Sequence, residues 1–516
     1  MTAQPKPLRI KRLTLTDFRA FPGPAPAHFD LDSGNLLVYG ENGAGKSSLF
    51  YALRDFFSLK PSRDLRQYKN VFSGEPDTTC RVEVTFNDGA THAAWYLQPR
   101  SVAAGTNIIA RRPIERHPAK GSPSDQRVMQ AALRRACLDY RALLDTNYKH
   151  DDVINLFDIA VNHLVHDFPV PVAGGLRKTV GELWQGVLNA KPNKHGPRLI
   201  ARVNAACADF NAGFNQALAS LHPFIGTLLG DLIGADVTIA PFGFAGVTYN
   251  QAHYKRDRDF DGKTLKLDVS FRTLALAQPQ HFLNEGRLSA LALAIYLGGR
   301  LACTPSAPGQ ALKLLVLDDV LIGLDHSNRL PVLDVLHTHF PDWQVVLLTH
   351  DKTWFDLARE RLPKNDWGCC EIYEGDPASV APMPIVRPTM NKPARALLQK
   401  ADDLLKLGYV EAAANYARQA FEFGLRVACE LKKIKLIYRQ DPTDHKAQVY
   451  LDALKSWQVT GSLKQADWDA AIHRLELLKS AVMNPYSHPS SPNIPKQEVT
   501  DAITAVTTFL DLVAKK

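Results

Sequence analysis

The sequence predicts an α/β fold followed by an all-helical domain, and three observations carry this prediction. A continuous apolar run at residues 35–40 leads through a glycine-rich loop into a segment with helical spacing. A second apolar run, residues 312–317, ends at two aspartates. Beyond residue 394, apolar side chains recur at helical spacing to the end of the chain. Buried parallel strands are continuous apolar runs, whereas amphipathic helices repeat about every 3.6 residues.

The first 123 residues have the pattern of strands around one helix. Alternating apolar and polar residues at 8–21 are typical of half-buried strands, and the run at 35–40 is typical of a buried one. Helical spacing follows at 46–57, and strand-like alternation returns at 80–110. We therefore expect residues 1–123 to form the N-terminal part of the α/β unit.

The rest of the chain divides by pattern into four parts. Residues 124–234 have helical spacing broken by glycine and proline, without a sustained heptad. This predicts a short helical hairpin or bundle inserted into the α/β unit, not a long coiled-coil arm. Residues 235–373 return to strands and helices and complete that unit. Five prolines within 374–393 indicate a linker, and 394–516 are expected to form the helical domain.

Composition sets limits on the class of protein. The 516 residues allow two to four domains, and the net charge of +8 favours nucleic acid or another polyanion as a partner. The alternative is a mildly basic protein whose charge serves only a small anionic ligand. Seven scattered cysteines without a CxxC pair indicate neither a zinc site nor a disulfide framework. The longest apolar stretch, 288–299, is too short for a bilayer, so a soluble, cytoplasmic protein without a membrane partner is expected.

Residues 40–48 read GENGAGKSS and match the pattern GxxxxGK[ST] in full. Such a loop, between an apolar strand and a helix, turns its backbone N–H groups toward phosphates, and the helix N-terminus adds a partial positive charge. Its lysine neutralises the β- and γ-phosphates and its serine hydroxyl ligates Mg²⁺. A chance match is the alternative, but the strand–loop–helix order is the one required. We therefore expect ATP to bind at the following residues: Gly40, Asn42, Gly43, Gly45, Lys46, Ser47 and Ser48.

The run LKLLVLDD, residues 312–319, has the pattern of a Walker B strand. Many buried strands end in aspartate, so the motif is weak alone but strong downstream of a phosphate-binding loop. Asp318 is expected to hold Mg²⁺ with Ser47. Asp319 lies where the attacking water would be polarised, which makes it the candidate catalytic base.

Together these motifs resemble the ABC-type ATPases, most closely the SMC and RecF-like branch. The resemblance implies an ABC-type P-loop NTPase head with two lobes that hydrolyses ATP with Mg²⁺. It also implies that Arg19, in LTDFRAF, approaches the nucleotide phosphates. In the same way Asp325, in GLDHSNR, takes the D-loop position, and His350, in VVLLTHD, takes that of the switch histidine at the γ-phosphate. A lone histidine after a strand is usually structural, but its order and distance from Walker B favour the switch.

The signature motif is where the chain departs from that family. Residues 283–287, LNEGR, align with LSGGQ and open an apolar helix; the alternative is a buried helix without this role. The predicted signature residues are Asn284, Glu285 and Gly286. In the family, one subunit's signature completes another's ATP site, which implies a homodimer around two ATP molecules and leaves higher oligomers open. Aspartate in place of the usual glutamate at 319 suggests slow hydrolysis. Gln98 is the candidate for the Q-loop.

The interval between Lys46 and Asn284 is too short for a long coiled coil. In this the chain resembles compact SMC-like ATPases associated with bacterial anti-phage defence, over residues 8–60 and 235–360. Double-stranded DNA is an expected partner. Basic clusters that would contact its phosphates, unless they are only solvated surface, are residues 111–120, Arg134 and Arg135, residues 194–198, and Lys255, Arg256 and Arg258.

The C-terminal helical pattern resembles HEPN-like domains. Active HEPN ribonucleases carry an arginine four to six residues before a histidine, whereas His488 is preceded by Asn484, and Arg474 is too far away. An inactive module for dimerisation or partner binding is therefore favoured, with Tyr486 also of interest. The predicted function is an ATP-gated sensor or regulator in anti-phage defence that controls an effector protein. The alternatives are a RecF-like DNA repair ATPase and an ATPase-controlled HEPN-type ribonuclease.

Overall fold

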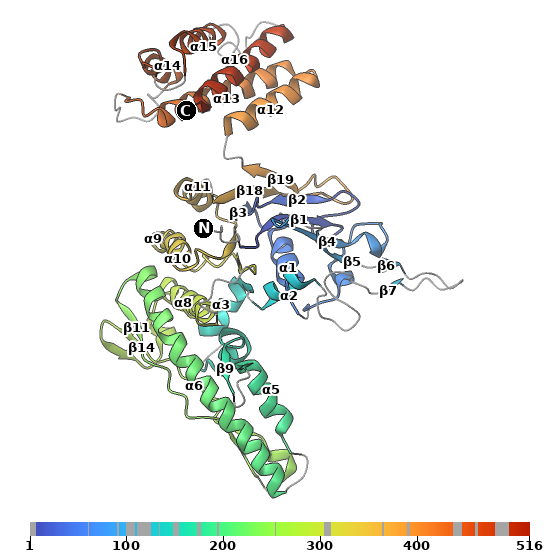
Figure 1. Cartoon of the computed structure of the whole chain (residues 1–516), viewed down its shortest axis with the longest axis vertical. Helices are drawn as coiled ribbons and strands as arrows, with labels where there is room; N and C mark the ends of the chain where they lie inside the picture. The colour runs from blue at the N-terminus through green and yellow to red at the C-terminus, as the bar shows by residue number, and fades with distance from the viewer. Residues whose placement is uncertain are drawn as a thin grey trace, which may run out of the picture. The chain divides into compact units, whose positions relative to one another are not determined.

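The computed structural model describes residues 7–59, 61–89, 92–96, 98–99, 109–110, 125–133, 135–147, 154–172, 177–192, 196–252, 254–303, 311–363, 366–389, 393–436, 446–459, 463–479 and 495–515. Its contacts divide the chain into two compact units, Met1–Pro388 and Thr389–Lys516. Strands and helices alternate in the first unit, and the second is helical, so the predicted α/β class with a helical C-terminal part is confirmed (Figure 1).

A six-stranded sheet forms the centre of the first unit. Its strand order is β19-β18-β3-β17-β16-β8, and the pairs from β18 through β8 are parallel. Both faces are covered, so the strands β3, β16 and β17 are buried at nearly every position and consist mainly of apolar residues. The strands are β3 Asn35–Gly40, β8 Arg135–Asp139, β16 Leu314–Asp318, β17 Gln344–Thr349, β18 Trp367–Tyr373 and β19 Ile385–Thr389.

A second, antiparallel sheet has the order β2-β1-β4-β5. Helix α1, Lys46–Phe56, shares one hydrophobic cluster with both sheets: Leu49 and Leu53 pack with Val38 and Val316 of the central sheet and with Leu13 of β1. The helix that follows the glycine-rich loop is therefore held between two sheets. The strands are β1 Ile10–Thr16, β2 Ala27–Asp30, β4 Arg81–Phe86 and β5 Ala93–Tyr96.

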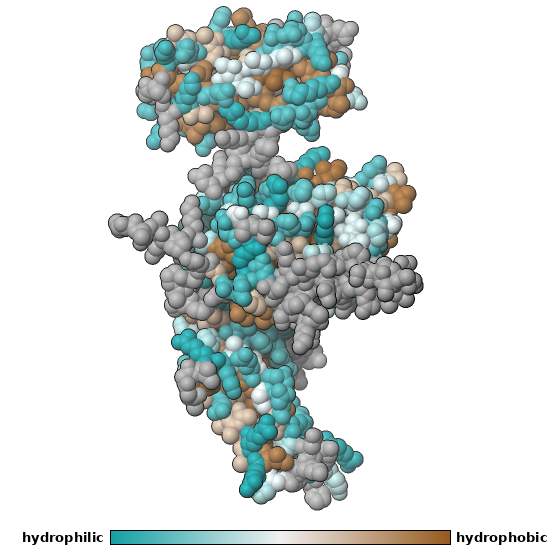
Figure 2. All heavy atoms as spheres, turned by 45° about the vertical axis from the view of Figure 1, so that its right-hand side comes forward, coloured by the Kyte–Doolittle hydropathy of each residue, from teal (hydrophilic) through white to brown (hydrophobic). Residues whose placement is uncertain are grey.

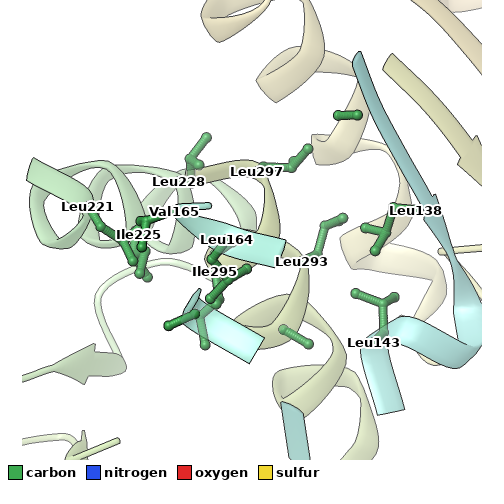
Figure 3. Packing of buried hydrophobic residues seen from close by; sticks show 14 of the residues in the cluster. Leu138, Leu143, Leu164, Val165, Leu221, Ile225, Leu228, Leu293, Ile295 and Leu297 are labelled. Atoms are coloured by element: carbon green, nitrogen blue, oxygen red, sulfur yellow. The ribbon is translucent and has the colours of Figure 1, made fainter. Parts of the chain in front are cut away.

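Helix α8, Glu285–Cys303, belongs to the other hydrophobic cluster of this unit, together with Leu315 and Leu347 of the central sheet. It is apolar around most of its circumference, which is the pattern of a helix buried on all sides. Figure 3 shows Leu293 and Leu297 of α8 between α6 and the region of Leu138 and Leu143. The other helices of this part are α2 Gln126–Ala132, α3 Tyr140–Asn147, α4 Phe157–Ile159, α7 Pro279–Phe282, α9 His326–Arg329, α10 Pro331–His339 and α11 Lys352–Arg361.

Helices α5, Val180–Ala190, and α6, Pro197–Ile233, pack together and extend away from the central sheet as an arm (Figure 1). Thr179 begins α5 with a capping box to Glu182, and a side chain at Gly213 of α6 would meet Leu183 and Val170 at 2.9 Å. The 37 residues of α6 span about 55 Å. Short strands accompany the arm and its base: β9 Pro169–Pro171, β10 Arg177–Thr179, β11 Val237–Ile239, β12 Thr248–Tyr249, β13 Phe260–Asp261, β14 Val269–Phe271 and β15 Leu274–Leu276.

The structure corrects two of the sequence-based boundaries. Residues 124–234, predicted to be a helical insert, contain β8, which pairs with β16 in the central sheet. Residues 374–393, predicted to be a linker, contain β19 at the edge of that sheet. Pro388 lies in β19, and an edge strand tolerates proline because one side of the strand needs no ladder hydrogen bonds.

The second unit is a bundle of helices around one hydrophobic cluster. Trp468 is fully buried at its centre, packs edge-on against Trp457 and at a tilt against Phe509, and donates its indole N–H to the carbonyl of Leu454 at 3.1 Å. The helices are α12 Pro393–Lys406, α13 Val410–Leu431, α14 Ala447–Lys455, α15 Gln465–Leu478 and α16 Lys496–Ala514. Asn484, Tyr486 and His488 lie outside the described residues. Among the helices that are described, none has the length and hydropathy that a membrane span requires.

We expect Leu293→Ala to destabilise the first unit, because the side chain is fully buried in α8 and its loss leaves a cavity. A loss of about 2–5 kcal/mol in the free energy of unfolding is expected. Urea unfolding of the full chain, followed by circular dichroism, would measure it. Leu357→Ala, at a leucine of α11 that is 51% exposed, is the control. Equal midpoints for the two variants would contradict the assigned burial.

Candidate nucleotide site

The glycine-rich loop connects the end of β3 with the start of α1. Gly43 and Gly45 adopt φ angles of +89° and +108°, in the left-handed region that favours glycine. The Lys46 ammonium turns back over the loop and donates to the carbonyl oxygens of Gly40 at 2.5 Å and Glu41 at 3.1 Å. A side chain at Gly40 would meet Lys46 Cγ at 2.9 Å, so this glycine leaves room for the lysine.

Asp318 and Asp319 stand at the end of β16, beside this loop. Ser47 Oγ donates to Asp318 Oδ2 at 3.4 Å, and Lys46 Nζ lies 3.9 Å from Asp319 Oδ2. Asp319 also accepts from the backbone N–H of His350 at 3.0 Å and contacts its Nδ1 at 2.9 Å. With Asp319 ionised, the imidazole must carry its proton on Nδ1, because a carboxylate can only accept.

Burial raises the pKa of Asp318 to about 7, with a further contribution from the adjacent Asp319 carboxylate; the Lys46 ammonium opposes both. The pKa of Lys46 is itself lowered by burial. The side chain of Asp318 is only 8% exposed, and its Oδ1 is buried without a hydrogen-bond partner among the described residues. Buried polar atoms are normally bonded, so this orphaned oxygen is one that a bound cation would satisfy.

A pocket of about 440 Å³ opens over the loop. Of the predicted site residues, it brings together Arg19, Asn42, Gly43, Gly45, Lys46, Ser47, Ser48 and Asp319. Its wall also contains residues that the sequence analysis missed, namely Ala20, Glu41, Gln67, Lys69 and Val71. The last three come from the loop around the short 3₁₀ helix Leu65–Tyr68, which has no motif in the sequence that points to a ligand.

The predicted signature lies at the start of α8. Asn284 Oδ1 accepts from the backbone N–H of Arg287 at 3.0 Å and so caps this helix. Asp325, which precedes α9, lies against Gly286: a side chain at this glycine would meet Asp325 Oδ2 at 2.7 Å. Asn284, Glu285, Gly286 and Asp325 are not among the described residues that line the nucleotide pocket of the same chain.

The Q-loop candidate, Gln98, belongs to a two-stranded sheet of β6, Gln98–Pro99, and β7, Ile109–Ala110, separate from the central sheet.

Asp139 is the last residue of β8, the strand beside β16, and is in register with Asp318. Its charge contributes to the raised pKa of Asp318. Asp139 therefore lies beside the Mg²⁺-site candidate Asp318, and the sequence analysis did not single it out. Its signal is an acidic residue at the end of the short alternating run RACLD.

The fold and this geometry can be compared with known proteins. A family model described as "RecF/RecN/SMC N terminal domain" matches residues 9–364. The chain belongs to this family. Its members are ATP-binding ATPases, so the RecF/RecN/SMC domain of this chain is an ATPase domain of the ABC type. Comparison with curated proteins gives no match.

Solved structures similar to the RecF/RecN/SMC domain include an Smc head bound to the C-winged helix domain of ScpA, with a TM-score of 0.41 and 12% identity over 75% of this chain and 99% of that one. A second is the Smc head with an extended coiled coil bound to the C-terminal domain of ScpA from Pyrococcus furiosus, with a TM-score of 0.39 and 11% identity over 76% and 99%. A third is the recombination mediator protein RecF with ATPrS, with a TM-score of 0.40 and 12% identity over 74% and 99%.

The family implies Mg²⁺, and the residues present fit this ion. Ser47 Oγ and Asp318 Oδ2 lie within 3.4 Å of each other, and Asp318 Oδ1 is the orphaned oxygen described above. Hydroxyl and carboxylate oxygens are the hard ligands that Mg²⁺ prefers, and the ion takes its remaining ligands from water and phosphates. The described residues contain no cluster of three or more His, Cys, Asp or Glu side chains that would hold a metal by themselves.

The raised pKa of Asp318 predicts a pH dependence of stability when no metal is present. Between the ordinary aspartate pKa and about 7, the folded RecF/RecN/SMC domain keeps a proton that the unfolded chain has lost. The free energy of unfolding should therefore fall as pH rises through this window and level off above it. Urea unfolding in EDTA at several pH values would show the decline in the wild type. The difference between wild type and Asp318→Asn isolates the effect, and a difference that is constant with pH would contradict it.

Proposed function

We propose that this protein is a slow, Mg²⁺-dependent ATPase that works as an ATP-gated switch. The observation that carries the proposal is that Lys46, Ser47 and Asp319 line one pocket, where Ser47 contacts Asp318 and Asp319 contacts His350. Lys46 binds the phosphates of ATP, and Ser47 with Asp318 holds Mg²⁺, which neutralises phosphate charge when bound. Asp319 accepts the proton of the attacking water, and His350 orients Asp319.

Slow turnover follows from how Asp319 is held. Its backbone adopts φ +53°, and its Oδ1 is engaged by two nitrogen atoms of His350. Aspartate is one methylene shorter than glutamate, so it reaches a phosphate-bound water less easily. A site that binds ATP readily and hydrolyses it slowly keeps the ATP-bound state populated, which suits a switch better than a motor.

We expect ATP hydrolysis by the full chain to depend on Lys46. Lys46→Ala removes the phosphate counter-charge, and ATP affinity should fall by about 100-fold, or about 2.7 kcal/mol. Equilibrium binding and steady-state phosphate release would measure the two effects. Lys406→Ala, at an exposed lysine of α12, is the control and should match the wild type. Unchanged affinity in Lys46→Ala would refute the assignment of the phosphate loop.

The dimer proposal rests on the separation of signature and pocket within one chain. Asn284, Glu285 and Gly286 would complete the ATP site of a second copy, with Asp325 at the junction. The substitution Asn284→Asp tests this cleanly. Aspartate keeps the helix cap, because its carboxylate accepts from Arg287 as the amide does, but it would place a negative charge against the partner's phosphates.

Mixing two inactive variants should restore activity if ATP is bound between copies. Each hybrid of Lys46→Ala with Asn284→Asp has one site with an intact loop and an intact signature. Random exchange of chains then gives about a quarter of the wild-type ATPase rate. Each variant alone, at the same total concentration, is the control. Hybrid dimers without recovered activity would contradict completion of the site in trans.

Double-stranded DNA is the proposed ligand that triggers the ATPase. Of the basic clusters, residues 111–120, Arg134, Lys194 and His195 lie outside the described residues, and nothing is described of the Lys255 side chain. Lys191, Asp259 and Lys263 form ion pairs that tie the end of α5 to the segment after Arg256. Arg256 therefore lies beside the arm, and Arg198 lies on it because it belongs to α6. Both arginines are exposed, and the visible face of the arm is mostly hydrophilic in Figure 2.

The DNA proposal is tested by ATP hydrolysis with and without linear duplex at two salt concentrations. Stimulation that falls steeply with salt is expected from phosphate contacts. Preferential stimulation by gapped or ended DNA without a protein partner would favour the second candidate, a RecF-like DNA repair ATPase, which the family match also supports. No stimulation at either salt concentration would remove DNA as the trigger.

Control of an effector protein in anti-phage defence is the remaining part of the proposal. Its support is the compact arm and the separate helical unit, which offers a binding module apart from the ATPase. Purification of the full chain with ATP or ADP, followed by mass spectrometry of co-purifying proteins, tests whether an effector is held in one nucleotide state only. RNA cleavage that is lost in His488→Ala would instead support an active C-terminal ribonuclease.

A further inference from the structure

The guanidinium of Arg19 lies on the face of an aromatic ring at the edge of the nucleotide pocket. Its Cζ is 4.4 Å from the centroid of the Tyr51 ring, well within the range of a cation–π contact. Tyr51 is on α1, the helix that begins with Lys46 and Ser47. The same helix therefore carries the phosphate-binding lysine and the ring on which Arg19 rests.

The backbone of Arg19 is fixed as well as its side chain. Its φ of +52° is in the left-handed region, which is uncommon for arginine. Its N–H donates to the carbonyl of Tyr68 at 2.6 Å, and its carbonyl accepts from Asn70 Nδ2 at 2.6 Å. These two contacts come from the loop that also supplies Gln67, Lys69 and Val71 to the pocket wall.

Arg54 contacts the same ring, and its guanidinium donates hydrogen bonds to neighbouring side chains, whereas Arg19 has a buried nitrogen without such a partner among the described residues. Arg54 lies 4.6 Å from the Tyr51 centroid and donates to Asp55 at 2.9 Å and to Ser62 at 2.5 Å. Burial lowers the pKa of Arg19, and its strongest electrostatic neighbours are two tyrosines and two arginines, with no carboxylate among them. Its Nε is buried without a hydrogen-bond partner among the described residues.

A buried carboxylate anchors this arrangement. Asp55 is 1% exposed and accepts from Tyr68 Oη at 2.6 Å and Ser62 Oγ at 2.8 Å, in addition to Arg54. It therefore joins α1 to the loop whose backbone holds Arg19. Among the described contacts of Arg19, the one with Tyr51 is made by the guanidinium itself.

We propose that Tyr51 is a positioning residue that holds the Arg19 guanidinium, which pairs with no carboxylate among the described residues, for contact with the phosphates of the bound nucleotide. The proposal rests on the proposed function, because it needs ATP in this pocket. The ring does not touch the nucleotide in this proposal; it acts through Arg19. Its contribution should therefore depend on the aromatic face, which phenylalanine retains, and should vanish when the guanidinium is removed.

The test is a double-mutant cycle on the full chain with ATP and Mg²⁺, read out by equilibrium binding. Tyr51→Phe should bind ATP as the wild type does, and Tyr51→Leu should bind about five-fold more weakly. Arg19→Ala should bind at least about ten-fold more weakly, and adding Tyr51→Leu to it should cause no further loss. Thermal unfolding of each variant checks that the unit remains folded.

Each outcome decides the proposal. If Tyr51→Leu lowers ATP affinity by the same factor in the wild type and in Arg19→Ala, the proposal is overturned, because the ring would then act by packing alone. Affinity of Tyr51→Leu equal to the wild type, or a loss in Tyr51→Phe equal to that in Tyr51→Leu, would overturn it too. If the wild type binds no ATP while Lys46→Ala behaves identically, the proposed function itself fails, and the two failures are thereby distinguished.

Discussion

The parallel register of β3, β17 and β16 is the constraint on which the site depends. Parallel strands end at the same edge of a sheet, so the glycine loop after β3, His350 after β17 and the two aspartates at the end of β16 meet there although more than 270 residues separate the loop from Asp318. The strands hold this register because both faces of the sheet are buried, against α1 on one side and α8 on the other. A one-residue slip would move the side chains of each face into the other hydrophobic cluster, where they do not fit, and would separate Ser47 from Asp318.

The pocket contains positive and negative side chains that are not fully compensated by one another, and these charges indicate the kind of ligand that it binds. The Lys46 ammonium and the Arg19 guanidinium are both partly desolvated, while Asp318 is buried beside a second carboxylate. A polyanion bound together with a divalent metal ion compensates both sets of charges. Its phosphates pair with Lys46 and Arg19, and the metal ion pairs with the carboxylates. Nucleotide and metal are therefore expected to bind cooperatively.

The sequence predicted the parts of the site that depend on local chain geometry. A glycine loop between strand and helix, and aspartates that end an apolar strand, are encoded within ten residues each. The parts it missed depend on distant pairing. The run that forms β8 is short and surrounded by helical patterns, and it becomes a strand only because β16 offers a free edge. The loop around Tyr68 reaches the pocket through Asp55 and the backbone of Arg19, and no periodicity reports such contacts.

The contacts also explain why Asp319 can be an aspartate. A φ of +53° costs aspartate less than most side chains, because its short polar group can bond locally, as it does to His350.

Contacts also connect His350 with the predicted signature. His350 is followed by Asp351, which pairs with Arg329. Arg329 Nε donates to the carbonyl of Leu324, the residue before Asp325. Asp325 in turn lies against Gly286 at the start of α8. A continuous set of contacts thus joins the predicted signature to the predicted base, through Asp325, the Leu324 carbonyl, Arg329, Asp351 and His350.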